Sequence, residues 1–244
     1  LAERGHRVDL LTCDSKGPLI NRVDRSIRIY RLEAFGELRA RISCLRADPS
    51  DWLAMLRPYL VAFKASPTVS FLPSVARFLR KEKPDALLSA APHLNIEAVL
   101  AKRLSGTKTR MVLSEHVNFS HNKPDSMAWR RRYILPLMRR IYPKADAVVA
   151  VSRGVAEDLA SNLGVLSAHI TTIANPVIPR DFADRAAAPL SHRWFNGDNT
   201  VPVVLSVGRP SPQKDFPTLI RAFAKVHRRR PVRLVIVGGA VRLE

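Results

Sequence analysis

The sequence predicts an α/β fold in which parallel β-sheets are covered by helices on both faces and are divided between two domains. Short apolar runs alternate with segments of helical periodicity along the whole chain, which is the order of strands joined by crossover helices. Helices are punctuated by glycine or proline, as at Gly5, Pro84 and Gly106. Residues 177–200 have the proline-rich, polar composition of a linker, so a domain is expected on each side of it.

The first domain is expected to span residues 1–176, and its elements follow in strict alternation. Residues 1–4 are typical of the last turn of a helix that Gly5 caps. The region 38–83 is expected to be mostly helical, with prolines such as Pro58 dividing it into short helices. Strands are expected at 6–12, 27–32, 86–89, 110–114, 147–151 and 170–173. Later helices are expected at 72–83, 95–104, 130–142 and 154–163, the last with Ser152 as its N-cap.

Length and cysteine usage restrict the class of protein. The 244 residues have room for one large domain or two smaller ones. No apolar run approaches the roughly 18 residues of a spanning helix, and the first residues lack the pattern of a signal peptide. Cys13 and Cys44 have no ligand-like spacing, and the histidines are scattered singly. We therefore expect a reduced, cytoplasmic protein whose mechanism needs no metal.

The formal net charge of +19 favours anionic partners. Residues 39–64 and 129–145 interleave cations with leucine, isoleucine, tryptophan and tyrosine, a mixture that suits an anionic membrane surface. An arginine-rich surface without a special partner explains the charge equally well. Nucleic acid is a less favoured partner, because no recognised nucleic-acid-binding motif is present. A peripheral position on the inner face of the membrane is thus one expectation.

The most informative stretch is a β-loop-α-β unit near the end of the chain. A strand at 203–207 leads into Gly208 and Arg209, and a polar loop with Lys214 leads into an amphipathic helix at 217–226. A second strand follows at 233–237, in a domain expected to begin at about residue 201. Phosphorylated ligands bind at such strand-to-helix crossings in α/β sheets, and two cations there would hold a phosphate. Two solvated loop cations are the ordinary alternative.

This unit resembles the donor-binding half of retaining glycosyltransferases of family 4, which have the GT-B fold. The resemblance rests on Gly208, Arg209, Lys214 and the following DFPTLIRAF, and on the segments SEHVNFS, DAVVAVSRGVAEDL and ITTIANPV. It implies two Rossmann-like domains, the second of them incomplete. It also implies that Arg209 and Lys214 hold the pyrophosphate of a nucleotide-sugar donor, with no metal and no cofactor.

The resemblance assigns a catalytic role to His116, which follows the strand at 110–114. A histidine at this position in the family contacts the donor sugar near the reacting carbon, whereas the structural alternative is a histidine that caps a loop. Glu115 is expected to orient this loop, and Asn118 to contact either the acceptor or the loop. Gly208 and Gly238 are weaker candidates for a close approach of the backbone to the nucleotide, because the residues after Gly238 depart from the family pattern.

The resemblance also leads us to expect that both ends are clipped. In the family, a glycine-rich loop stands before the helix that Gly5 closes, and paired glutamates stand beyond residue 244. A chain without these two parts is expected to be inactive by itself.

The predicted reaction is sugar transfer from a nucleotide-sugar to a hydroxyl of a lipid-linked or glycan acceptor, with retention at the anomeric carbon. The first alternative is a non-catalytic basic α/β protein that binds a membrane or a polyanion. The second is another enzyme of the same fold, an epimerase or a phosphorylase. No pair of catalytic carboxylates and no pyridoxal-binding lysine motif stands out in support of it.

Overall fold

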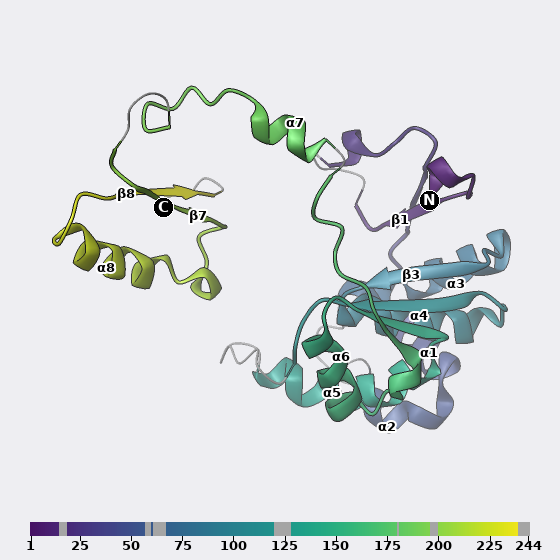
Figure 1. Ribbon diagram of the computed structural model, residues 1–244. Coiled ribbons are helices and arrows are strands. Elements are labelled where there is room, and N and C mark those ends of the chain that lie inside the picture. Colours follow the sequence, from purple (N-terminus) through teal and green to yellow (C-terminus); the bar gives the residue numbers. More distant parts are fainter. Residues whose placement is uncertain are drawn as a thin grey trace. The chain divides into compact units, whose positions relative to one another are not determined.

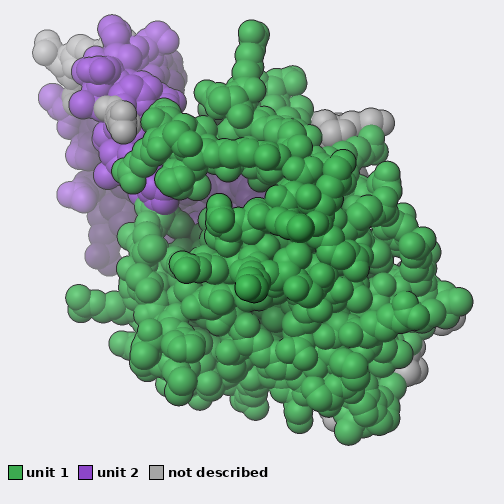
Figure 2. All heavy atoms as spheres, turned by 90° about the vertical axis from the view of Figure 1, so that its right-hand side faces the viewer, with its two compact units in different colours: residues 1–175 green, residues 176–244 purple. Residues whose placement is uncertain are grey.

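A computed structural model describes residues 1–14, 19–56, 60, 67–119, 128–179, 181–195 and 200–238, with backbone alone for 128–133. The chain divides into two compact units, Leu1–Asn175 and Pro176–Glu244 (Figure 2). Each unit contains parallel strands joined by helices (Figure 1). Pro58, expected to interrupt the helical region, lies outside the described residues.

The first unit contains a four-stranded parallel sheet. Its strands are neighbours in chain order, β3 (Ala86–Ala90), β4 (Arg110–Glu115), β5 (Ala147–Ala150) and β6 (Ile170–Thr172). A separate parallel pair is formed by β1 (Asp9–Thr12) and β2 (Arg28–Arg31). The strands are where the alternation of apolar runs predicts them, with ends that differ by at most three residues.

Helices cover one face of the four-stranded sheet. Because consecutive strands are neighbours and crossovers are right-handed, the crossover helices fall on the same side. These are α4 (Pro92–Ser105), α5 (Ala128–Ile141) and α6 (Arg153–Leu163). Met111 and Leu113 are fully buried on the covered face, whereas Leu88 on the other face is 64% exposed. The expectation of helices on both faces is thus wrong for this sheet, within the part of the chain that is described.

Further helices pack on the outside of α4. Helix α3 (Leu72–Glu82) lies against α4, and α1 (Glu37–Ala47) contacts both. The short helix α2 (Trp52–Met55) contacts α5. The buried apolar residues of α3 recur at helical spacing, which explains why this segment forms an amphipathic helix: Leu72, Val75, Ala76, Phe78 and Leu79. The core of the unit therefore lies between the sheet and these helices.

Local signals set the helix ends. The side chain of Ser152 accepts a hydrogen bond from the Val155 amide, which confirms it as the N-cap of α6. Gly5 ends a one-turn 3₁₀ helix with a φ of 79°, and Gly106 ends α4 with a φ of 68°. Both conformations are left-handed, which glycine adopts without steric cost. The predicted glycine caps are confirmed.

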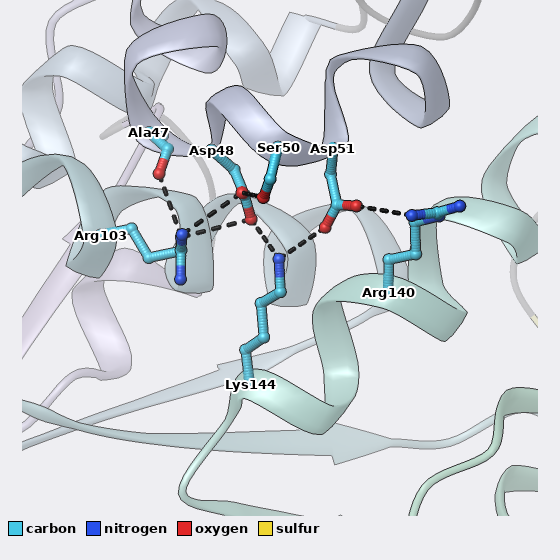
Figure 3. A network of polar contacts seen from close by, with 7 residues as sticks. All are labelled: Ala47, Asp48, Ser50, Asp51, Arg103, Arg140 and Lys144. Atoms are coloured by element: carbon cyan, nitrogen blue, oxygen red, sulfur yellow. Dashed lines mark hydrogen bonds and ion pairs between the residues drawn. The ribbon is translucent and has the colours of Figure 1, made fainter.

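A polar network joins the α1–α2 segment to α4 and to the end of α5 (Figure 3). Asp48, which is fully buried, accepts hydrogen bonds from Lys144 and from Arg103. Asp51 accepts from Lys144 at 2.6 Å and from Arg140 at 2.8 Å. Lys144 thus lies between two carboxylates from a distant part of the sequence and holds three elements together.

The second unit contains the expected β-loop-α-β arrangement. Strand β7 (Val203–Val207) pairs in parallel with β8 (Arg233–Val237), and α8 (Phe216–His227) connects them. A short helix α7 (Phe182–Ala187) forms within the stretch expected to be a linker, where alanines favour a helix. Among the described residues of this unit, only Val232 is buried. None of the helices described in either unit has the length and apolar character needed to span a membrane.

Candidate active site

The carboxyl end of β4 carries the first group of candidate residues. Glu115 ends the strand and pairs with Ala150 of β5, and its carbonyl accepts from the Val151 amide at 3.2 Å. His116 follows immediately and is exposed, with its Nε2 3.0 Å from the Ser114 hydroxyl. Parallel pairing on both sides of β4 therefore fixes the backbone from which His116 projects.

Glu115, which directly precedes this histidine, is fully buried. Its Oε1 accepts a hydrogen bond from the Tyr142 hydroxyl at 2.5 Å and another from Asn95 Nδ2 at 2.8 Å. Its Oε2 has no partner among the described residues. Burial raises the pKa of Glu115 to about 7, although the hydrogen bonds from Tyr142, Asn95 and the His116 backbone oppose that rise. This carboxyl group can therefore exchange its proton near neutral pH.

Asn95 organises the adjacent strand end. Its Oδ1 accepts from the Ser89 hydroxyl at 2.7 Å, and its Nδ2 lies 3.1 Å from the Ser114 carbonyl. Ala91, between β3 and α4, has a φ of 86°, which is a strained conformation for a residue with a Cβ. Such outliers persist where the surrounding contacts hold them, here at the carboxyl edge of the sheet.

Reasoning from the sequence did not identify Asn95 or Tyr142 as part of this site. The position of Asn95 just after a strand was a usable signal. Tyr142 carried none, because it lies 27 residues from Glu115 and meets it only through the fold.

Asn118 ties the loop after β4 to helix α6. Its Nδ2 donates to the Gly154 carbonyl at 3.2 Å, and the neighbouring Phe119 amide donates to Asp158 at 2.5 Å. These contacts anchor the loop that contains His116 to the first turns of α6. Asn118 therefore makes a loop contact, which is one of the two roles considered for it.

The second group of candidate residues surrounds the end of β7. The Gly208 amide donates to the Val237 carbonyl at 2.8 Å, so the two strand ends stay together. A Cβ on Gly208 would lie 3.3 Å from three side-chain carbons of Lys214, and a Cβ on Gly238 would lie 2.1 Å from the Gly208 carbonyl oxygen. Lys214 thus lies across Gly208, and Gly238 allows a close approach of the backbone, though to Gly208.

Arg209 and Lys214 are both exposed at this strand end. In the described part of the chain, neither is paired with a carboxylate. Asp215 follows Lys214 and caps α8, accepting from the Thr218 amide at 3.3 Å. Two unpaired cations beside the amino end of a helix form an environment that attracts an anion such as phosphate.

The fold thus gathers Glu115, His116 and Asn118 in one unit, and Gly208, Arg209, Lys214 and Gly238 in the other. Each unit is described by itself. The two-domain fold that the sequence predicts leads us to expect both groups at one cleft, and this stays a prediction. The described residues contain no cluster of three or more side chains suited to a metal ion.

Comparison with known proteins identifies the family. The model of the family described as Glycosyltransferase Family 4 matches residues 1–180. A Campylobacter jejuni relative is 29% identical over 146 residues, covering 58% of this chain and 36% of the relative. It is the N-acetylgalactosamine-N,N'-diacetylbacillosaminyl-diphospho-undecaprenol 4-alpha-N-acetylgalactosaminyltransferase.

Solved glycosyltransferase structures show the same fold. A glycosyltransferase from Rickettsia africae has a TM-score of 0.59 at 17% identity, covering 99% of this chain and 55% of its own. HepE from Anabaena, solved with UDP and glucose, has a TM-score of 0.53 at 16% identity, covering 97% of this chain and 62% of its own. The chain spans between about a third and two thirds of the length of these relatives.

These likenesses confirm the predicted α/β fold of the GT-B type. The family match covers well over half of the residues, from the first strand through β6. This chain belongs to glycosyltransferase family 4.

Proposed function

We propose that this chain is part of a retaining glycosyltransferase that moves a sugar from a nucleotide-sugar to an acceptor hydroxyl, without a metal or a cofactor. Membership of the family supports the reaction class. The observation that carries the donor site is the position of Lys214 across Gly208, beside Arg209 and the amino end of α8. A diphosphate bound there would meet two cations that no described carboxylate pairs with.

In this mechanism the bond between the anomeric carbon and the diphosphate oxygen breaks, and negative charge gathers on the leaving diphosphate. Arg209 and Lys214 stabilise that charge where it develops. The acceptor oxygen attacks from the same face, and a diphosphate oxygen takes its proton, so the enzyme needs no base of its own. His116 aligns the sugar, and Glu115 with Asn95 and Tyr142 holds the strand end that presents His116.

Two relatives support the substrate classes. The name of the Campylobacter jejuni relative gives an acceptor linked through diphosphate to undecaprenol, a lipid. The Anabaena neighbour was solved with UDP and glucose. We propose by analogy a nucleotide-linked hexose donor and a lipid-linked or envelope glycan acceptor, of the glycolipid, lipopolysaccharide or exopolysaccharide type.

The outer side of α1 supports a lipid-linked acceptor. Leu38, Ile42 and Leu45 recur along one face of this helix and are all exposed, Leu38 to 74%. Exposed Trp52 and Leu53 follow in α2, and the exposed cations Arg39 and Arg46 stand on α1. Apolar side chains next to cations are the combination that enters an anionic membrane surface.

Helix α5 contributes less to such a surface than its sequence suggests. Arg139 donates to the Asn162 carbonyl at 2.6 Å, and Arg140 is bound to Asp51. The side chains of Arg130, Arg131 and Arg132 lie outside the described residues. We therefore propose that α1 and α2 are the main contact with the membrane on its cytoplasmic side.

Replacement of the two cations tests the donor site. In the protein encoded by the full reading frame, Arg209→Ala and Lys214→Ala should each lower kcat by about two orders of magnitude or more, because the charge of the leaving group loses its stabilisation. Lys225→Ala, which removes a cation from the last turn of α8, is the matched control and should stay within about threefold.

Turnover is measured with radiolabelled nucleotide-sugars, and thermal unfolding checks that each variant is folded. Kinetics near those of the unchanged protein in both variants would exclude this donor site. A protein that binds anionic vesicles but neither binds nor consumes any nucleotide-sugar would instead be the non-catalytic basic α/β protein.

A further inference from the structure

A cavity of about 840 Å³ opens at the edge of the sheet opposite to His116. Its walls are the loop from α3 into β3 and the loop from α4 into β4, so it lies at the amino ends of these two strands. Strand β4 separates it from Glu115 by five residue steps, which is about 17 Å of extended chain. The cavity is therefore distinct from the carboxyl ends of the strands, where the sugar-transfer residues lie.

The lining of this cavity is strongly cationic. Arg80, Lys83, Lys108 and Arg110 line it together with a single carboxylate, Asp85. Among the described residues, none of the four cations forms an ion pair. Helices α3 and α4 both end here, and two helix carboxyl ends offset about one positive charge in total. The four cations therefore exceed what Asp85 and the helix ends neutralise, and a net attraction for anions remains.

Hydroxyl groups lie among the cations. Ser105 donates its proton to the Lys102 carbonyl at 2.8 Å, so Thr107 is the donor in the 2.9 Å contact between the Ser105 and Thr107 hydroxyls. The hydroxyls of Thr107 and Thr109 are 3.3 Å apart. Thr109 is only 3% exposed and lines the cavity. The hydroxyls therefore bond among themselves and to the backbone, and the cations supply the donors that phosphate oxygens accept.

Lys83 occupies a position where glycine would be unstrained. It closes α3 with a φ of 46°, in the left-handed region, whereas α4 and α6 close on Gly106 and Gly164. A lysine here carries a steric cost that glycine avoids. Lys83 lines the cavity, so the chain places a cationic residue at this helix end in spite of that cost.

We propose that this cavity binds a phosphate-bearing ligand larger than a single phosphate ion, at a site separate from the sugar donor. Its volume lies within the roughly 300–1,000 Å³ of small-molecule sites. The four cations donate to the phosphate oxygens. Either a soluble phosphorylated molecule or the headgroup of an anionic phospholipid presents this chemistry.

Binding of two probes tests the proposal and distinguishes the two sources. Inorganic pyrophosphate is titrated by calorimetry, and vesicles of phosphatidylglycerol are used in co-sedimentation. Both measurements use the full chain carrying Arg209→Gln and Lys214→Gln, so that the proposed donor site contributes nothing. The vesicle measurement also carries Leu38→Ser and Leu53→Ser, which weaken the proposed membrane contact of α1 and α2. Lys83→Gly and Lys108→Gln are then added together. Lys81→Gln is the matched control, because Lys81 is an exposed cation of α3 that does not line the cavity.

A soluble ligand is supported if pyrophosphate binds saturably and Lys83→Gly with Lys108→Gln weakens that binding about tenfold or more. Lys81→Gln should leave the affinity for pyrophosphate within about twofold. The same pattern with vesicles alone supports a phospholipid headgroup. Lys83→Gly should leave the melting temperature unchanged or raised, since it removes the strained conformation, so lost binding cannot be ascribed to unfolding. Absence of binding to both probes overturns the proposal. So does binding that the cavity variants do not alter.

Discussion

At the scale of single residues, Glu115 is the feature with the clearest chemical consequence. It is fully buried, one oxygen accepts both hydrogen bonds, and the other has no partner among the described residues. A carboxyl group in this environment is more stable protonated, which is why its pKa is raised to about 7, with burial as the main cause. Burial likewise raises the pKa of Glu97, a residue of α4, to about 8.

The raised pKa of Glu115 predicts that stability falls with rising pH. The folded state holds the proton up to about pH 7, whereas the unfolded state releases it near its ordinary value of 4.5. The free energy of unfolding should therefore decrease between these two values, by up to roughly 3 kcal/mol for this group. Glu115→Gln should remove this part of the decrease, because the amide oxygen can still accept from Tyr142 and Asn95.

Urea unfolding at a series of pH values from about 4.5 to 8 measures this effect. Glu97→Gln is the parallel case, since it should remove a decrease that extends to about pH 8. The contrary outcome is a stability of Glu115→Gln that declines with pH as steeply as that of the unchanged protein. That result would contradict a buried, protonated carboxyl group at this position.

At the scale of elements, the network around Lys144 holds the α1–α2 segment against α4 and the end of α5. Asp48 and Asp51 bring two carboxylates to one lysine, with Arg103 and Arg140 at the two sides (Figure 3). Asp48 is fully buried, so its charge depends on these partners in place of water. The same network positions α1, whose outer face carries the proposed lipid contact.

Lys144→Met should lower the free energy of unfolding by roughly 3 kcal/mol, since it leaves two neighbouring carboxylates without their shared cation. Lys102→Met is the matched control, because the side chain of Lys102 is 23% exposed, close to the 27% of Lys144, and pairs with the more exposed Asp146. Its cost should stay near 1 kcal/mol. Equal losses for the two variants in denaturant unfolding would show that the network adds nothing beyond an ordinary surface ion pair.

At the scale of the whole molecule, the net charge of +19 sets how the protein meets anionic surfaces. Charge alone attracts it to any polyanion. The exposed apolar side chains of α1 and α2 add a preference for a surface that they can enter, which a nucleic acid does not offer. The combination therefore favours an anionic membrane.

Leu38→Ser combined with Leu53→Ser should weaken binding to anionic vesicles about tenfold or more, because each leucine loses its transfer into the interface. Binding of the unchanged protein should also decrease as salt shortens the Debye length and should be weak on neutral vesicles. Leu166→Ser, at a leucine that is 68% exposed elsewhere in the first unit, is the control. Co-sedimentation that is equal and negligible on both vesicle types would favour a soluble acceptor.

The sequence alone determined the features that depend on neighbouring residues. The alternation of strands and helices follows from local apolar periodicity, and the caps at Gly5, Gly106 and Ser152 follow from the backbone and hydrogen-bonding chemistry of those residues. The same holds for the β7-loop-α8-β8 unit that carries Arg209 and Lys214. Each of these signals lies within a short window of sequence.

The tertiary structure decided what depends on distant residues. The chain order of β3 to β6 placed the crossover helices on one face, where the sequence predicted two covered faces. Glu115 meets Asn95 and Tyr142 across separations of 20 and 27 residues, and Asp48 meets Lys144 across 96. The cationic cavity likewise joins two loops that follow different helices. Such contacts are selected by packing and by the need to satisfy buried polar groups, and neither can be read from local periodicity.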